Sequence, residues 1–84
     1  MTEKQVFETV RTIVADKMEY PEDKIYPETK LLTDLEGDSL DAVEIIMQIE
    51  DEFDIEIPDS KSEDLINKGD IGDIVQYILD ELSK

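Results

Sequence analysis

A serine between two aspartates, in the segment Asp38-Ser39-Leu40-Asp41, is the part of this sequence best placed to do chemistry. An apolar helical pattern begins directly after it, so Asp38 is predicted to be a helix N-cap, with Asp41 at the capping-box position. Ser39 would then be the first helical residue, exposed beside backbone N–H groups that have no partner within the helix. A phosphate ester would be favoured there, because helix N-termini attract anions. Serine is also an ordinary residue at helix starts, so these four residues alone leave a modified serine and a structural one open.

The composition argues against Ser39 being a catalyst itself. The chain has no histidine and no cysteine, which removes the commonest general base, disulfides and thiolate metal ligands. The segment around Ser39 also lacks the second glycine of the Gly-x-Ser-x-Gly elbow found in hydrolases. A calcium loop needs a carboxylate at position 1, glycine at position 6 and glutamate at position 12, and none of the three glycines of the chain gives that frame. We therefore expect neither enzymatic activity nor a metal site.

The elements that must position Ser39 are helices. Apolar residues recur at helical spacing over residues 3–17, 39–53 and 71–82. The last stretch is the best marked, because Asp73 lies at the capping-box position three residues after its predicted cap. The residues predicted to cap the three helices are Thr2, Asp38 and Asp70.

The segments between these helices are predicted from length and apolar content. About twenty residues, 18–38, form a loop of a length that is often functional in compact domains. Residues 55–59 are predicted to be an extended crossover without a strand partner, and residues 62–66 a short helical turn. The expected fold is all-α, a small and mostly antiparallel helical bundle in one domain of residues 1–84. The apolar residues expected to anchor the long, ordered loop are Tyr20, Ile25, Tyr26, Leu31, Leu32 and Leu35.

The helix that begins at Ser39 has two apolar faces. One is expected to face the core and consists of Ala42, Ile45, Ile46, Ile49 and Phe53. The other consists of Leu40, Val43 and Met47 and is bordered by carboxylates. This second face fits a docking surface for a partner, and it equally fits a helix buried over a broad arc. Periodicity alone leaves both interpretations open.

Charge is the most unusual feature of the composition. The net charge is −16, and residues 31–60 contain eleven acidic residues and no lysine or arginine. Acidity can serve solubility alone, but a surface built only for solubility usually mixes both signs. A stretch of one sign favours steering toward basic partners and repels nucleic acid and anionic membranes. The first fifteen residues predict neither a signal peptide nor a membrane span, so a soluble cytoplasmic protein is expected.

Two segments resemble a known family. They are TDLEGDSLDAVE at residues 33–44 and EDEFDIEIP at residues 50–58, and they are similar to the acyl carrier proteins of fatty-acid and polyketide synthesis. The motifs span about half of the chain, and its length, helix order, long first loop and acidity extend the resemblance to nearly all of it. The resemblance implies a four-helix bundle of three main helices and one short helix. It also implies that a phosphopantetheinyl transferase esterifies Ser39 with 4′-phosphopantetheine from coenzyme A, which would bring the thiol that the chain lacks.

The resemblance also implies roles for further residues. Asp38 would flank the serine during recognition by the transferase. Enzymes of acyl-chain synthesis would dock on the carrier through their own basic patches. The carrier itself would be a monomer. The residues implied to bind partners are Leu40, Asp41, Val43, Glu44, Met47 and Glu50. The residues implied to sheath the acyl chain, carried as a thioester, are Leu32, Ile49, Phe53, Ile57, Leu65 and Ile74.

Two departures from the family pattern leave the pathway open. Glu36-Gly37 stands where small residues are common, and residues 67–70 replace the usual threonine-rich segment before the last helix. The chain could therefore be the primary carrier of fatty-acid synthesis or a specialised one. Alternatives to both are an acidic protein-interaction module that is never modified, such as a decoy or a nucleic-acid mimic, and a carrier of aminoacyl groups.

Overall fold

The computed structural model describes residues 1–35 and 38–84, so Glu36 and Gly37 lie outside the described residues. The described residues contain no strand, which confirms the all-α prediction. The elements are α1 (Glu3–Met18), the 3-10 helix η1 (Glu22–Lys24), α2 (Ser39–Phe53), α3 (Asp59–Asn67) and α4 (Ile71–Leu82).

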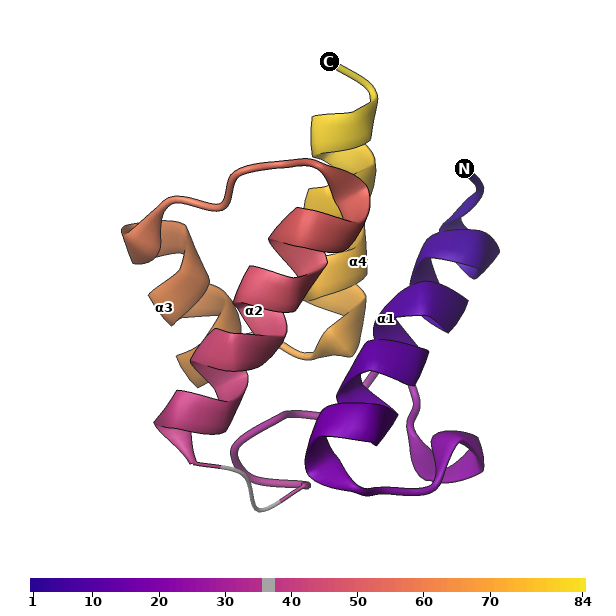
Figure 1. The fold of residues 1–84 in the computed structure, drawn as a ribbon, viewed down its shortest axis with the longest axis vertical. Helices are drawn as coiled ribbons and strands as arrows, with labels where there is room; N and C mark the ends of the chain where they lie inside the picture. The colour runs from indigo at the N-terminus through magenta and orange to yellow at the C-terminus, as the bar shows by residue number, and fades with distance from the viewer. Residues whose placement is uncertain (36–37) are drawn as a thin grey trace.

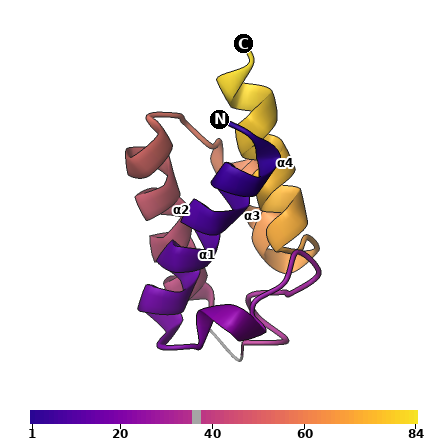
Figure 2. The same cartoon turned by 90° about the vertical axis from the view of Figure 1, so that its right-hand side faces the viewer.

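The long helices α1, α2 and α4 form the body of the bundle (Figure 1). Helix α1 runs opposite to both α2 and α4 and packs against both, while α3 packs against α2. Figure 2 shows the two termini at one end of the molecule and the long loop at the other. Ser39, at the start of α2, therefore lies at the loop end of the bundle.

The predicted bounds of α2 and α4 are confirmed, and α1 extends one residue further than expected. Capping boxes begin α1 and α4, because Thr2 and Gln5 exchange hydrogen bonds of 3.2 and 2.8 Å, and Asp70 and Asp73 exchange bonds of 2.9 and 3.0 Å. These side chains satisfy N–H groups that the helices leave free. The buried face that each long helix contributes to the core is Val6, Val10, Ile13 and Val14 from α1, Ala42, Ile45, Ile46, Ile49 and Phe53 from α2, and Ile71, Ile74, Val75 and Ile78 from α4.

Helix α3 is longer than the short turn predicted for residues 62–66, because it begins at Asp59 and ends at Asn67. Pro58 stands at its N-cap, and its carbonyl accepts the first helical hydrogen bond from the N–H of Ser62 at 2.8 Å. The first turn of α3 is exposed and contains no apolar residue, so periodicity gave no signal there. The inward-facing pair Leu65 and Ile66 is buried as predicted.

The long loop is held against the start of α4. The N–H of Ile71 donates to the carbonyl of Thr29 at 2.9 Å, and the N–H of Gly72 donates to that of Pro27 at 2.7 Å. The Thr29 hydroxyl accepts from the N–H of Tyr26 at 2.9 Å, and the Thr29 N–H donates back to the Tyr26 carbonyl at 3.0 Å. Thr29 is 7% exposed and is the one buried polar side chain in the part of the chain that the structure describes. The free N–H groups of α4 thus determine the path of the loop.

Most of the expected loop anchors are confirmed. Ile25, Leu31 and Leu35 are buried, and Tyr20 and Leu32 are half-buried. The prediction is wrong for Tyr26, whose side chain is 57% exposed because its backbone forms the turn closed by Thr29.

The 3-10 helix Glu22–Lys24 was not predicted, since it is three residues long and contains no apolar residue. Glu22 connects it to α1, because its carboxylate accepts a hydrogen bond of 3.0 Å from the Thr12 hydroxyl.

Replacing Thr29 with valine tests this loop anchor. Thr29→Val keeps the shape of the side chain but leaves the Tyr26 N–H without its acceptor, so we expect a loss of about 1 to 3 kcal/mol in the free energy of unfolding. Urea unfolding followed by circular dichroism measures it. Thr33→Val, at an exposed loop position, is the control and should change stability by less than about 0.5 kcal/mol. Equal effects of the two variants would contradict the assigned role of Thr29.

Candidate functional site

The predicted cap of α2 is present. Asp38 has extended backbone angles (φ −96°, ψ 174°), and its carboxylate accepts a hydrogen bond of 2.9 Å from the N–H of Asp41. The return bond that would complete a capping box is not formed within the described residues, in contrast to α1 and α4. The Asp41 side chain occupies the expected position but takes no part in the cap. Its carboxylate is therefore available to interact with other groups.

Ser39 is the first residue of α2, and its side chain is exposed as predicted. No hydrogen bond within residues 1–35 and 38–84 involves its hydroxyl. Over the same residues, the N–H groups of Ser39 and Leu40 have no acceptor, whereas the equivalent groups of α4, those of Ile71 and Gly72, donate to the loop. The start of α2 therefore offers a free hydroxyl beside N–H donors that favour an anion.

Periodicity left open whether the second apolar face of α2 is a docking surface or is buried. The exposure of its side chains decides between the two. Leu40, Val43 and Met47 are 65%, 42% and 58% exposed, whereas the opposite face lies in the core. We call these three residues the outer strip. They form an apolar strip on the helix that begins at Ser39, and burial in the bundle does not account for them.

Two of the carboxylates predicted to bind partners have partners within the chain. Glu44 forms an ion pair with Lys17 of α1. Glu50 accepts a hydrogen bond of 2.8 Å from the N–H of Ile57, in the crossover between α2 and α3. Sequence reasoning missed both contacts, because neither follows a local spacing rule. Glu50 therefore has a structural role in addition to any role in binding.

The six residues implied to sheath an acyl chain lie in one apolar cluster. Ile49 and Phe53 come from α2, Leu65 from α3 and Ile74 from α4, and all four are buried. Ile57 of the crossover is also buried, and Leu32 of the loop is half-buried against the same cluster.

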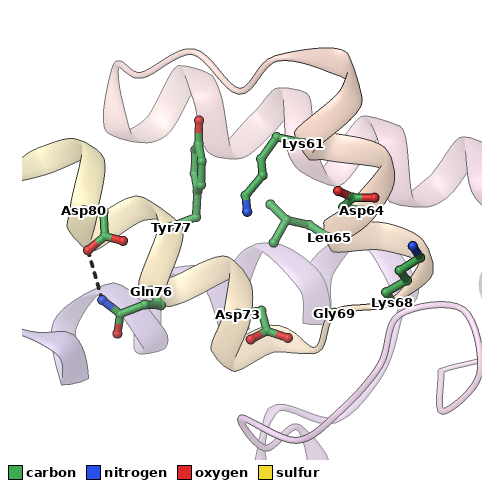
Figure 3. A pocket seen from close by; sticks show the side chains of 9 residues that line it. All are labelled: Lys61, Asp64, Leu65, Lys68, Gly69, Asp73, Gln76, Tyr77 and Asp80. Atoms are coloured by element: carbon green, nitrogen blue, oxygen red, sulfur yellow. Dashed lines mark hydrogen bonds between the residues drawn. The ribbon is translucent and has the colours of Figure 1, made fainter.

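Leu65 also borders a hollow of about 310 Å³ between α3 and α4 (Figure 3). The rim of this hollow is polar, and the ammonium of Lys61 lies 5.6 Å from the centroid of the Tyr77 ring. Sequence reasoning did not single out this hollow, because its charged residues lie on two helices. The residues that line it are Lys61, Asp64, Leu65, Lys68, Gly69, Asp73, Gln76, Tyr77 and Asp80.

Two features are absent from the described residues. None of their helices is both long and apolar enough to cross a membrane. They also include no group of three or more acidic side chains arranged to hold a metal ion.

The chain is similar to known proteins over most of its length. The family model described as phosphopantetheine attachment site matches residues 8–78. A protein named acyl carrier protein from Lactobacillus acidophilus is 41% identical over 78 residues, which cover 93% of this chain and 94% of that protein. The protein of the same name from Helicobacter pylori is 40% identical over 75 residues, covering 89% and 92%. The one from Campylobacter lari is 42% identical over 73 residues, covering 87% and 91%.

A solved structure of acyl carrier protein from Enterococcus faecalis has the same fold. It matches with a TM-score of 0.79 and 28% identity, covering 96% of this chain and 99% of that one. The names of these relatives describe a carrier, which agrees with the expectation that the chain is not an enzyme.

The matched family model makes 4′-phosphopantetheine the cofactor, and the start of α2 fits it. The group is attached through a phosphate, and Ser39 offers an exposed hydroxyl at a helix N-terminus, where a phosphate is stabilised. When attached, phosphopantetheine supplies a thiol, which this chain of 84 residues without cysteine does not have.

Replacing Glu50 tests its structural role. Glu50→Ala removes the acceptor of the Ile57 N–H, so we expect the free energy of unfolding to fall by about 1 to 2 kcal/mol. Glu50→Gln keeps an oxygen acceptor and should lose less than half of that. Chemical unfolding of both variants, beside Glu52→Ala as an exposed control, measures the difference. Equal losses for Glu50→Ala and Glu52→Ala would exclude this role.

Proposed function

The chain belongs to the acyl carrier protein family, and we propose that Ser39 is the residue on which it carries its phosphopantetheine arm. The observation that supports this is the exposed Ser39 hydroxyl at the N-terminus of α2, beside N–H groups without acceptors among the described residues. Asp38 holds that terminus in place through its bond to the N–H of Asp41. Asp38 would also flank the serine when the transferase recognises it.

The chain contributes position to the attachment step rather than catalysis. The Ser39 oxygen loses its proton and forms the new bond to the phosphorus of coenzyme A that bears pantetheine. The diphosphate bond breaks, and adenosine 3′,5′-bisphosphate leaves. A base must accept that proton, and the chain has no histidine to do so. We propose that the phosphopantetheinyl transferase, with magnesium, supplies the base and the charge stabilisation. The N-terminus of α2 would stabilise the phosphate diester that results.

The carried acyl group would be held as a thioester and sheathed in the apolar core. The burial of Ile49, Phe53, Ile57, Leu65 and Ile74, with Leu32 packed against them, supports this proposal. These residues come from α2, α3, α4, the crossover between α2 and α3 and the loop before α2, so small shifts of the helices would make room for a chain. The enzymes served would be those that build acyl chains in fatty-acid or polyketide synthesis.

Partner enzymes would dock on α2. The outer strip is exposed and apolar, and Asp41 and Glu44 lie on the same helix. Basic patches on the partners would complement these carboxylates and speed association. We propose that residues 1–84 act in this way as one monomeric carrier domain in the cytoplasm, without binding nucleic acid or membranes.

Replacing Ser39 tests the attachment site. After incubation with coenzyme A and a phosphopantetheinyl transferase, the intact mass of the chain should rise by one phosphopantetheine group. Ser39→Ala should abolish this gain while circular dichroism and the unfolding midpoint stay close to those of the parent, because the side chain is exposed. Ser60→Ala is the matched control, since Ser60 is also exposed in the first turn of a helix.

The same measurement distinguishes the alternatives. A folded parent chain that gains no mass would overturn the carrier proposal and favour an unmodified interaction module. A gain that persists in Ser39→Ala would assign the arm to another residue. The mass of the cargo on chain isolated from its host would separate acyl from aminoacyl carriage.

Replacing Met47 tests the docking surface. Met47→Gln keeps the length of the side chain and the helix propensity but removes apolar contact, so we expect the KM for loading by the transferase to rise about three- to tenfold. Stability should change little, because Met47 is 58% exposed. Leu82→Gln, at an exposed apolar residue of α4, should leave KM unchanged. A KM that responds equally to both changes would contradict docking on the outer strip.

A further inference from the structure

One basic side chain of α1 contacts α2, the acidic helix on which partners would dock. Lys17, in the last turn of α1, forms an ion pair with Glu44 of α2. The described residues contain two other ion pairs. Arg11–Glu22 joins α1 to η1, and Lys84–Glu81 joins two residues near the C-terminus. Lys17–Glu44 is thus the one ion pair of the described chain that connects two long helices.

This pair borders the outer strip. Glu44 follows Leu40 by four residues and precedes Met47 by three, which places it beside both on the helix surface. The side chains of Lys17 and Glu44 are 33% and 42% exposed, so an approaching partner can reach both. Glu44 is therefore at once a predicted partner contact and a group with an internal cation already bound.

The acidic surroundings keep Lys17 charged and close. The hydrogen bond to Glu44 raises the pKa of Lys17, and the negative charges of Glu44 and Asp41 raise it further. Lys17 is therefore fully cationic at neutral pH. Residues 31–60 contain no basic residue of their own, so the positive charge beside Glu44 comes from another segment of the chain.

We propose that Lys17 is a specificity-determining residue, which occupies Glu44 in the free carrier and must be displaced by a basic side chain of the partner. This inference rests on the proposed docking of partners on α2. Displacement favours arginine over lysine on the partner, because a guanidinium binds a carboxylate through two parallel hydrogen bonds and an ammonium binds as a point charge. The displaced Lys17 would still interact with Asp41, whose charge already acts on it.

A purely structural ion pair predicts different behaviour. Exposed pairs contribute little to stability, so a clamp between α1 and α2 would affect the unfolding midpoint at most and leave partner kinetics alone. Competition for Glu44 instead predicts that removing the Lys17 charge changes the KM of the partner enzyme for the carrier, and that this change depends on ionic strength. The kcat and the unfolding midpoint should change little.

The test uses loading of the full chain by a phosphopantetheinyl transferase with coenzyme A, at several salt concentrations. Lys17→Met keeps the apolar stem and removes the charge, and we expect it to lower KM about two- to fivefold at low salt, with the effect fading at high salt. Lys17→Arg keeps the positive charge beside Glu44, so its KM should equal or exceed that of the parent. Lys4→Met is the matched control, because Lys4 is an exposed lysine at the other end of α1 and its loss changes the net charge equally.

Repeating the lysine substitutions in a Glu44→Gln variant tests whether Lys17 competes with the partner for the Glu44 carboxylate. In Glu44→Gln, the effect of Lys17→Met should shrink to that of Lys4→Met, since there is no longer a carboxylate to release. Equal effects of Lys17→Met and Lys4→Met in the parent, or an undiminished effect in Glu44→Gln, would overturn the inference and leave the carrier proposal intact. A parent chain that is folded but not loaded would overturn both.

Discussion

The first N–H groups of a helix have no acceptor within it, and the arrangement of this protein depends on where those groups are satisfied. At α4 they donate to the carbonyls of Thr29 and Pro27, which holds the long loop against the bundle. Those two residues belong to the segment that precedes Ser39 in the chain, so the donors of α4 anchor part of that segment. At α2 the N–H groups of Ser39 and Leu40 have no acceptor among the described residues, and such donors favour an anion. Free N–H groups at a helix start therefore hold the loop at α4, and at α2 they are proposed to stabilise the phosphate on Ser39.

The parts of this arrangement that the sequence predicts are those set by short-range rules. Helices α2 and α4 begin and end where predicted, because each combines an apolar stripe with an aspartate cap. The position of Ser39 follows from the same rules. The start of α3 does not, since its first turn is exposed and its cap is Pro58, so neither periodicity nor a polar cap marks it. Tyr26 was misjudged because a turn held by Thr29 directs its side chain to solvent.

The contacts that the sequence does not predict are those between segments far apart in the chain. The pair Lys17–Glu44 depends on how α1 crosses α2, and the bond from Ile57 to Glu50 depends on the path of the crossover. From the sequence alone, the carboxylates of residues 31–60 are equivalent members of one acidic stretch. Among the described residues, the structure divides them into carboxylates with a hydrogen-bond or ion-pair partner within the chain and carboxylates without one. That division decides which of them a partner can bind freely.

The acidity of α2 therefore has to be considered one residue at a time. Asp38 caps the helix and Glu50 holds the crossover, so a partner that withdrew either carboxylate would weaken the fold that presents Ser39. The Asp41 side chain takes no part in the cap, and Glu44 is bound only by an exposed lysine. A basic partner that docks as proposed would thus meet Asp41 directly and Glu44 in competition with Lys17, beside the apolar outer strip. Affinity on this face would then depend less on the net charge of −16 than on which of its carboxylates have no partner within the chain.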